Sequence, residues 1–414
     1  TTELHVIRPL GGIDPHYVYR FLQQESVRRD AAANFTGSAG QLRAPMSFIA
    51  DLELPLPPLA EQRRIVGKLE LLLGKVSSSQ QRLSRVPGLL KRFRQSVLAA
   101  ACSGKLTADW REENDCVEPA SDLIARLGSE RRERHRELCV AAKNDKRGKP
   151  QEFDNIEPSV RTDLDTFDLP SDWSWVDLRF VMTVDEPFCY GVVQPGVNEP
   201  NGNLLVRAGD LQNGTVNLSE LRRIPADIDA EYERSRLKGG ELLVTVVGAG
   251  IGTVAIAPTS CAGFNIARAV AKVPIRDVSA EYVFQWFNTS KALSWMVGDA
   301  REVARPTLNL EQLRTILVPL PPLSEQQEIA RRVEKLFAFA DQIEARLRQA
   351  QAHIDRLTQS LLAKAFRGEL VPTEHALAER EHRDYEPASA LLERIRKESK
   401  IGSLPVTRRP RRRS

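Results

Sequence analysis

The sequence predicts an α+β fold in which mixed or mainly β domains are joined by two long antiparallel coiled-coil helices. Three observations support this prediction: an internal repeat of about 265 residues, two heptad seams, and short apolar or alternating runs broken by glycine and proline. The 414 residues are 42% apolar and 28% charged, which is an ordinary globular balance. A chain of this length has room for roughly two to four domains.

The repeat is clearest around a proline-rich box. Residues 54–73 (LPLPPLAEQRRIVGKLELLL) match residues 318–337 (VPLPPLSEQQEIARRVEKLF) at ten of twenty positions, at an offset of 264. The same offset aligns 91–106 with 355–370, and nearby offsets align 118–127 with 386–395 and 15–22 with 280–287. The second copy of the repeat therefore begins near Phe167. The first copy is shorter, because Thr1 corresponds to about position 100 of the repeat unit. We expect an N-terminally truncated chain, a fragment in preference to a naturally shorter protein.

A long helix is expected to follow each box. Prolines end at Pro58 in the first copy, and Ser324 follows the second box as a plausible N-cap. Apolar residues then recur in alternating steps of four and three, which is a coiled-coil seam. The seam positions are Ile65, Leu69, Leu72, Val76, Ser79, Leu83, Val86, Leu90, Phe93 and Val97, then Ile329, Val333, Leu336, Ala340, Ile343, Leu347, Ala350, Ile354, Leu357 and Leu361.

The two helices have similar lengths, so we expect them to pair with each other. Residues 65–97 alone would span about 50 Å as a helix. A two-fold relation between the copies makes the pair antiparallel. Pro87 and Gly88 should kink the first helix, and Gly104 and Gly368 should end the two helices. From the seam alone, a plain helical bundle without a spacer role stays the alternative.

The region between the helices has the sequence pattern of a β-rich domain. Strands are expected in NLLVRAGDL, GTVNLSEL, GELLVTVVGAGIGTVAIAP and ARAVAKVPI, and residues 279–300 are expected to form one helix with Tyr282, Trp286, Leu293 and Val297 near one face. The run VGAGIG lacks the third glycine of a dinucleotide-binding loop, because Thr253 stands there and a strand-like segment follows. A glycine-rich turn is therefore favoured.

Several classes of function find no support. The sequence has no G-x-x-x-x-G-K-[ST], H-E-x-x-H or G-x-S-x-G motif, and no spacing of carboxylates singles out a catalytic pair. Five scattered cysteines and six histidines do not suggest a metal cluster, and they fit a reducing cytoplasm. No apolar run approaches the roughly 20 residues of a membrane helix, and no signal peptide is visible. The sequence does not look like an enzyme acting alone.

The β-rich region carries many arginines among aromatic, asparagine and glutamine residues, although the net charge of the chain is only +4. Lys and Arg neutralise phosphates, and Arg, Asn and Gln can read base edges, so this mixture suits DNA. A solvated polar surface is the simpler interpretation of composition alone. The final segment TRRPRRRS carries five arginines and would attract polyanions without specificity.

Four motifs together resemble one family. The doubled P-L-P-P-L-x-E-Q box, the ending Q-S-[VL]-L-A-x-A-x-x-G-x-L, the tail E-P-A-S-x-L and the segment LPSDWSW resemble the DNA specificity subunit of type I restriction-modification enzymes. The resemblance implies two target recognition domains, each reading half of a bipartite DNA site, held apart by an antiparallel coiled coil that acts as a ruler. It also implies a subunit without catalysis of its own.

The resemblance further implies partners and a domain plan. The implied partners are double-stranded DNA, two methyltransferase subunits, and restriction subunits that cut DNA. S-adenosylmethionine, ATP and Mg would bind those partner subunits and not this chain. The expected parts are a truncated first recognition domain (1–53), a first spacer helix (54–106), a charged connector with a short helix (107–166), a second recognition domain (167–317), a second spacer helix (318–370) and a tail (371–414).

The same resemblance places DNA contacts in the glycine-rich turn and in the loop ARPTLN. The candidate residues are Arg207, Asn265, Arg268, Arg301, Arg305, Thr307 and Asn309. Gly248, Gly250 and Gly252 are expected to serve the turn more than the DNA. Two other functions compete: a coiled-coil scaffold that does not touch DNA, and a methyltransferase fused to its reader. The scaffold leaves the Arg- and Asn-bearing β domain unexplained, and the fused enzyme lacks a cofactor loop.

Overall fold

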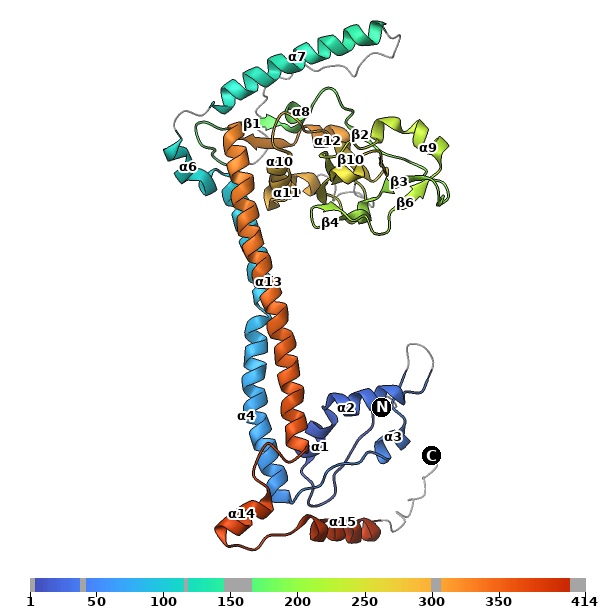
Figure 1. Cartoon of the computed structure of the whole chain (residues 1–414), viewed down its shortest axis with the longest axis vertical. Helices are drawn as coiled ribbons and strands as arrows, with labels where there is room; N and C mark the ends of the chain where they lie inside the picture. The colour runs from blue at the N-terminus through green and yellow to red at the C-terminus, as the bar shows by residue number, and fades with distance from the viewer. Residues whose placement is uncertain (1–3, 38–41, 115–117, 145–165, 299–306, 403–414) are drawn as a thin grey trace, which may run out of the picture. The chain divides into compact units, whose positions relative to one another are not determined.

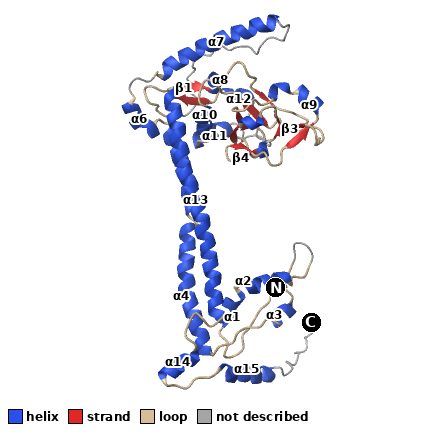
Figure 2. Cartoon of the chain, viewed as in Figure 1, coloured by secondary structure: helices blue, strands red, loops and turns tan. Residues whose placement is uncertain are grey.

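The computed structural model describes residues 4–37, 42–114, 118–144, 166–298 and 307–402. Contacts divide the chain into two compact units: unit 1 comprises residues 1–88 and 342–414, and unit 2 comprises residues 89–341. Within the described residues, every named strand belongs to unit 2, and unit 1 is built from helices and loops (Figure 2). The α+β prediction is therefore confirmed. No helix of these described ranges has the length and apolar character that crossing a bilayer requires.

The long helices lie where the heptad seams predict them (Figure 1). They are α4 (Leu59–Leu83), α5 (Val86–Cys102) and α13 (Leu323–Phe366). The first predicted helix is divided into α4 and α5 just before Pro87, because proline has no backbone N–H and its ring clashes with the carbonyl four residues before it. The second is one helix of 44 residues. It begins at Leu323, so Ser324 lies inside its first turn and is not the predicted cap.

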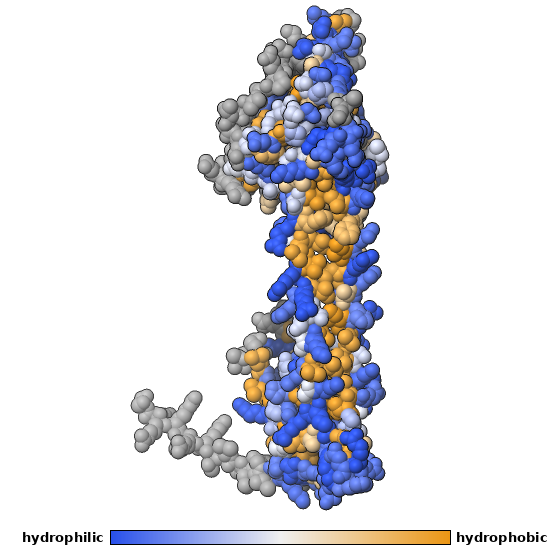
Figure 3. Space-filling model, turned by 90° about the vertical axis from the view of Figure 1, so that its left-hand side faces the viewer, coloured by the Kyte–Doolittle hydropathy of each residue, from blue (hydrophilic) through white to orange (hydrophobic). Residues whose placement is uncertain are grey.

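Each unit contains an antiparallel helix pair. In unit 1, Ile65 and Leu69 of α4 share an apolar cluster with Leu362 and Ala365 of α13, and Gln80 Nε2 donates to an Asp355 carboxylate oxygen at 3.4 Å. Residue numbers therefore rise along α4 as they fall along α13. Apolar residues, coloured orange, follow the visible face of the long helices (Figure 3).

The pair in unit 2 runs in the same antiparallel sense. Arg94 of α5 forms an ion pair of 2.7 Å with Asp341 of α13, and Arg332 Nη1 donates to the carbonyl of Leu106 at 2.9 Å. Val97 and Leu98 of α5 belong to the same buried cluster as Ile329 and Val333 of α13. The end of α5 therefore lies beside the start of α13.

Replacing Pro87 and Gly88 should stabilise the first helix. We predict that Pro87→Gln with Gly88→Ala, the residues found at Gln351 and Ala352 of the second copy, raises helicity by circular dichroism. The free energy of unfolding should rise by more than the about 1 kcal/mol of a helical Gly→Ala change. Gly74→Ala, in α4 with open space around the added Cβ, measures the glycine effect alone. If the double variant is no more stable than Gly74→Ala, Pro87 does not lower the free energy of unfolding.

The β-rich domain of unit 2 contains several small sheets. One has the strand order β2-β10-β7-β8, a second has the order β6-β3-β9, and β1–β11 and β4–β5 form antiparallel pairs. The strands are β1 (Ser174–Asp177), β2 (Cys189–Tyr190), β3 (Asn203–Val206), β4 (Leu211–Gln212), β5 (Thr215–Val216), β6 (Arg222–Ile224), β7 (Leu242–Thr245), β8 (Val254–Ile256), β9 (Asn265–Ile266), β10 (Val270–Val273) and β11 (Leu317–Leu320).

Helices cover these sheets and extend from them. They are α6 (Ala108–Glu113), α7 (Ala120–Asn144), α8 (Leu178–Val181), α9 (Ala226–Glu231), α10 (Ala280–Phe287), α11 (Ser290–Gly298) and α12 (Leu310–Arg314), with short 3-10 turns at Lys105–Thr107, Ala208–Asp210, Glu233–Ser235 and Thr259–Cys261. The main core gathers aromatic side chains from β1 and these helices: Trp175, Trp286 and Trp295 lie with ring centroids 5.6–6.1 Å apart.

The single helix expected over 279–300 is wrong in one respect. The chain forms α10 and α11 with a break at Asn288 and Thr289. Thr289 Oγ1 accepts a hydrogen bond from the Ala292 amide at 3.1 Å, so it caps a new helix. Trp286 of α10 is buried as expected, whereas Leu293 of α11 is 42% exposed.

Unit 1 surrounds its helix pair with shorter helices. They are α1 (Pro15–Leu22), α2 (Glu25–Ala33), α3 (Met46–Ala50), α14 (Glu374–Glu381) and α15 (Ala388–Gly402). Tyr17 and Phe21 of α1 lie against the Phe366 ring at the end of α13, with centroids 5.0 and 5.3 Å apart. The described core of unit 1 is therefore mainly helical.

The two units make the same hydrogen bonds at matching residues. The Tyr17 hydroxyl donates to the Pro55 carbonyl at 2.9 Å, and the Tyr282 hydroxyl donates to Pro319 at 2.5 Å. Gln62 accepts from the backbone amide of Asp14, the N-cap residue of α1. Gln326 likewise accepts from the backbone amide of Ser279, the N-cap residue of α10, and both distances are 2.9 Å. The glutamine of each proline-rich box thus fixes a short helix to that box.

Candidate nucleic-acid interface

Four backbone segments of unit 2 meet in what we call the rim: residues 190–192, 246–248, 267–269 and 307–308. The Val246 amide donates to Ala269 at 2.9 Å, and the Leu308 amide donates back to Val246 at 2.9 Å. The Arg268 amide donates to Val192 at 2.8 Å. These bonds bring the predicted glycine-rich turn, Arg268 and Thr307 together, although they lie up to 60 residues apart in the sequence.

Glycines make this arrangement possible. A Cβ atom on Gly191 would lie 1.7 Å from the Ile266 carbonyl oxygen, so no larger residue fits while the two segments stay this close. Gly248 has φ +96°, a left-handed conformation that favours glycine, and the space around it is open. Strand β8 follows the turn, as predicted, and no dinucleotide-binding helix begins there.

Arg268 and Thr307 present exposed side chains on the rim. Thr307 pairs with Val247 through an isolated antiparallel bridge. Burial raises the pKa of the Tyr190 phenol, and the positive charge of Arg268 opposes part of that rise. The Tyr190 hydroxyl donates to the Leu308 carbonyl at 3.3 Å. Tyr190 belongs to the aromatic residues of the mixture that suits DNA, but it is not among the candidate contacts, because only the fold brings it beside Arg268.

Arg207 lies at the end of β3 and is held by a carboxylate. Its Nε and Nη2 atoms donate to the two oxygens of Asp210 at 3.1 and 3.0 Å. These hydrogen bonds raise the pKa of Arg207, and its side chain is 46% exposed. Asp210 therefore orients the Arg207 guanidinium in the absence of a ligand. One edge of the guanidinium is hydrogen-bonded to Asp210.

Asn265 is fully buried, unlike a residue that faces a ligand. Its amide nitrogen donates to Asp229 Oδ1 at 3.1 Å and to the Tyr232 carbonyl at 3.2 Å, and its amide oxygen accepts from the Ser235 hydroxyl. The side chain fixes β9 to α9 and to the segment that follows α9.

The remaining candidates divide in two. Asn309 caps α12: its side-chain oxygen accepts from the Gln312 amide at 2.7 Å, and Gln312 accepts from the Asn309 amide at 3.0 Å. Arg301 and Arg305 lie outside the described residues. The rim therefore brings together Arg268 and Thr307 from the predicted set, whereas Arg207, Asn265 and Asn309 lie outside it.

Many cations of the β-rich domain are also engaged within it. Arg236 pairs with Asp229 and Arg276 pairs with Glu186, while Arg223 donates to the Gly202 carbonyl at 2.9 Å. Lys272 is 2% exposed and donates to the carbonyls of Arg234 and Arg236, and burial lowers its pKa. The number of basic residues in the sequence therefore overstates the cationic surface.

The Asp229 network should make stability depend on pH. Burial favours the neutral acid, but hydrogen bonds from Arg236, Asn265 and Asn203 outweigh it and lower the pKa of Asp229. A lowered folded-state pKa adds stability above the unfolded value of about 3.9, and this is lost as pH falls toward the folded pKa. We predict that Asp229→Asn shrinks the drop in unfolding free energy between about pH 6 and pH 3 in urea titrations.

Asp227→Asn is the matched control, because Asp227 is exposed in the same helix α9. The Asp227→Asn variant should show the same acid-induced drop in unfolding free energy as the parent chain. An equal drop in the Asp229 variant would show that the network does not set the pH dependence.

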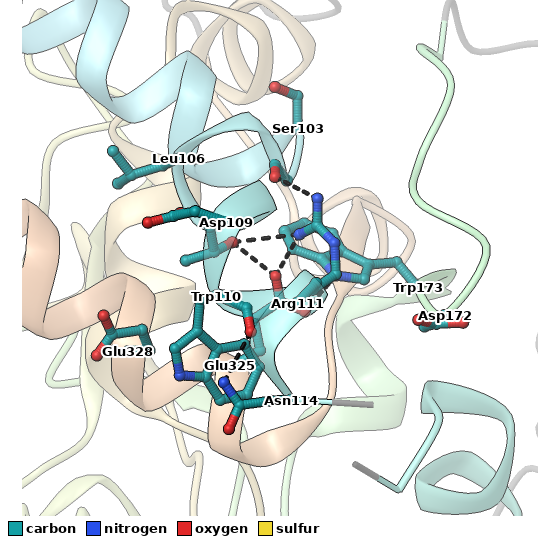
Figure 4. Close-up of polar contacts among 12 residues, drawn as sticks. Ser103, Leu106, Asp109, Trp110, Arg111, Asn114, Asp172, Trp173, Glu325 and Glu328 are labelled. Atoms are coloured by element: carbon teal, nitrogen blue, oxygen red, sulfur yellow. Dashed lines mark hydrogen bonds and ion pairs between the residues drawn. The ribbon is translucent and has the colours of Figure 1, made fainter. Parts of the chain in front are cut away.

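The sequence also missed a buried ionic junction at the start of α13 (Figure 4). Glu325 is fully buried and accepts three hydrogen bonds: from the Thr107 hydroxyl at 2.6 Å, from Trp173 Nε1 at 2.8 Å, and from Arg111 Nη1. Arg111 also donates to the Gly104 carbonyl at 2.6 Å. The junction joins the second proline-rich box to the tail of the first helix and to the start of the β-rich domain.

Unit 1 has a related junction at the matching glutamate. Glu61 is 5% exposed and accepts from the Glu374 amide at 2.7 Å. Arg64 donates to the Glu374 carboxylate at 2.5 Å, and Arg383 contacts its other oxygen at 2.7 Å. The signal that could have found both junctions is the Glu-Gln pair that occurs in each proline-rich box. In the described part of the chain, no group of three His, Cys, Asp or Glu side chains could hold a metal ion.

Comparisons with known proteins agree with these features. Residues 200–351 match the family model of the type I restriction modification DNA specificity domain. The chain is 40% identical to the type I restriction enzyme EcoBI specificity subunit of Escherichia coli, over 84% of this chain and 65% of that subunit. It is 32% identical to the EcoDI specificity subunit of Escherichia coli, over 84% of this chain and 69% of that subunit.

The fold has a solved relative. A chain from a structure described as "Structural basis underlying complex assembly and conformational transition of the type I R-M system" aligns with a TM-score of 0.60 and 18% identity. The match covers 86% of this chain and 72% of that chain, and at this identity it supports the fold alone. The sequence match to the EcoDI subunit, which this chain covers over more than two thirds of its length, decides the family. The chain belongs to the specificity subunits of type I restriction-modification enzymes.

Proposed function

We propose that this chain is a sequence-specific DNA-binding subunit that reads a bipartite site and has no catalytic activity of its own. Family membership and the rim of unit 2 support the proposal. The rim combines an exposed arginine, an exposed threonine, a tyrosine and a glycine turn with open space beside it. Arginine and threonine can donate to base edges, and a bare glycine turn lets backbone approach a groove closely.

Among the candidate residues, Arg268 and Thr307 are the ones we assign first to DNA. Arg207 would contact DNA with the edge that Asp210 leaves open, while Asn265 and Asn309 would act by holding the segments that carry the readers. Arg301 and Arg305 precede Thr307 by a few residues and stay candidates for the same loop.

We also propose the domain plan given by the sequence, with the recognition domains at 1–53 and 167–317, spacer helices at 54–106 and 318–370, a connector at 107–166 and a tail at 371–414. The matching contacts of Tyr17 and Tyr282, and of Gln62 and Gln326, support an internal duplication. In this proposal the antiparallel helices set the gap between the two half-sites, because DNA turns once in about 10 base pairs.

The test compares Arg268→Ala with Arg132→Ala. Arg132 is an exposed arginine on α7, so both variants lose one positive charge. Enrichment of a random duplex library by the methyltransferase complex should yield a bipartite motif. Arg268→Ala should cost about 1–3 kcal/mol at one base position, whereas Arg132→Ala should leave the motif unchanged.

Two outcomes would contradict the proposal at different levels. In the first, Arg268→Ala weakens binding equally on every DNA sequence and reduces the dependence of affinity on salt concentration. That result would make Arg268 a phosphate contact and not a base reader. If the complex enriches no motif at all, the coiled-coil scaffold becomes the better reading.

The partners follow from the same proposal. We infer that the chain docks methyltransferase subunits and restriction subunits in the cytoplasm, and that S-adenosylmethionine, ATP and Mg bind those partners. Each helix pair keeps exposed apolar side chains, Leu71 in unit 1 and Phe339 in unit 2, which would suit subunit contacts. Co-purification with the methylating subunit, and methylation that requires both proteins, test this part.

A further inference from the structure

Two valines are exposed on the loop that follows β2 in unit 2. Val193 is 50% exposed and Val197 is 71% exposed. Every other valine within residues 166–298 and 307–320, the described part of the β-rich domain, is buried or half-buried. A single exposed apolar residue on a protein surface needs no explanation. Two exposed valines within five residues, in a domain that buries or half-buries the rest, indicate a surface that a ligand covers.

The loop continues directly from the rim. The Val192 carbonyl accepts from the Arg268 amide at 2.8 Å, and the Val192 amide donates to the Ile266 carbonyl at 2.8 Å. Val192 is 1% exposed, whereas the Arg268 side chain is exposed. Val193 is the next residue, and consecutive Cα atoms are about 3.8 Å apart. A ligand that contacts the Arg268 side chain therefore lies within reach of this loop.

Strand β6 and helix α9 hold the loop in place. Arg222 Nη2 donates to the Gly196 carbonyl, and the Arg223 amide donates to Asn198 Oδ1 at 3.0 Å. Gly196 has φ +64°, and a Cβ added to it would lie 2.9 Å from the Ile228 side chain of α9. A loop that is ordered in advance loses little conformational freedom when it binds a ligand. The loop therefore presents its valines in a fixed arrangement.

The chemistry of valine restricts what the loop can contact. Its side chain has methyl groups and no hydrogen-bonding atom, so its partner must also be apolar. Among the base edges in the major groove of DNA, the C5-methyl group of thymine is the apolar feature. An apolar protein surface is the other kind of partner. The exposed cation of Arg268 beside the loop favours DNA, because arginine binds phosphates and base edges.

We propose that Val193 and Val197 determine specificity by contacting the C5-methyl group of a thymine in the half-site that unit 2 reads. The proposal rests on the proposed reading of DNA by the rim and adds a requirement to it. The half-site must contain an A·T pair within about two base pairs of the position that Arg268 reads, because neighbouring base pairs are about 3.4 Å apart along the duplex.

Replacing thymine by uracil tests this contact, because uracil lacks only the C5-methyl group. The complex of the full chain with its methyltransferase partner first enriches a bipartite motif from a random duplex library. Each thymine of the motif, on either strand, is then replaced by deoxyuridine, one at a time, and affinity is measured by competition. At one thymine near the Arg268 position, the parent complex should bind about fourfold more weakly, the effect of one methyl group returned to water.

A variant with Val193→Ala and Val197→Ala completes a double-mutant cycle. It should bind the thymine duplex more weakly than the parent does, and uracil at the same position should then have no further effect. The two single variants show which valine makes the contact. Val140→Ala is the matched control, because Val140 is a 58% exposed valine on α7 of the same unit, and it should keep the full uracil effect. Circular dichroism checks that all variants stay folded.

Three results would overturn the proposal: a motif without an A·T pair near the Arg268 position, no thymine there whose methyl group affects affinity, or an equal uracil effect in the parent and in the double variant. In each case the complex still enriches a motif, so the proposed reading of DNA by the rim stands. A complex that enriches no motif overturns both proposals together.

Discussion

Glu325→Ala should lower the free energy of unfolding of unit 2 by about 3–5 kcal/mol, because it removes a fully buried carboxylate that accepts hydrogen bonds from Arg111 and from two further donors. Thr107 and Trp173 would lose the bonds of 2.6 and 2.8 Å that they make to this carboxylate. Arg111 would keep the Gly104 carbonyl but would face a neutral cavity. Urea unfolding followed by circular dichroism measures the loss.

Glu328→Ala is the matched control on the same helix. Its carboxylate pairs with Arg331 and Arg332 at 2.7 and 2.6 Å, and these hydrogen bonds lower its pKa to about 2. The Glu328 side chain is 14% exposed, whereas that of Glu325 is fully buried, so we expect the removal of Glu328 to cost about 1 kcal/mol or less. A Glu325 variant within about 1 kcal/mol of the control would show that the junction is dispensable.

Trp286→Ala should also lower the free energy of unfolding by about 3–5 kcal/mol. The cause differs, because this change opens a large cavity in the core. Trp286 is 1% exposed and lies 5.6 Å from Trp175 and 5.7 Å from Trp295 between ring centroids. Its Nε1 also donates to the Leu317 carbonyl of β11 at 2.9 Å. The variant should therefore lose tryptophan near-ultraviolet dichroism as well as stability.

Trp286→Phe separates the two contributions. It retains an aromatic ring in the cluster and loses the hydrogen bond to Leu317, so it should cost less than half as much as Trp286→Ala. An alanine variant as stable as the phenylalanine variant would show that the ring adds little to the core.

The helical half of the fold could be predicted because its signals are local and periodic. The a and d positions placed Ile65, Leu69, Ile329 and Val333 in buried contacts, and Pro87 marked the interruption between α4 and α5. The division of residues 279–300 into two helices could not be predicted from periodicity, because Thr289 can cap a helix or lie inside one.

The candidate interface was predicted only in part, because its residues meet through long-range pairing. Asn265 has the side chain of a base reader, but Asp229, 36 residues before it, draws that side chain into the core. Tyr190 joins the rim because Leu308, 118 residues later, accepts its hydroxyl. The number of basic residues overstated the cationic surface for a related reason. The sequence around an arginine does not show whether its side chain will find an acceptor inside the domain.

The discontinuous composition of unit 1 has a consequence for synthesis. Unit 2 is one unbroken stretch, so it can fold as soon as residue 341 leaves the ribosome, whereas residues 1–88 must wait for residues 342–414. At about 5–20 residues per second, the wait for the 253 residues of unit 2 lasts roughly 13–50 s. During that time Ile65, Leu69 and Tyr17 lack the Leu362 and Phe366 neighbours that bury them. Residues 1–88 are thus the part of the nascent chain with the greatest need of a chaperone.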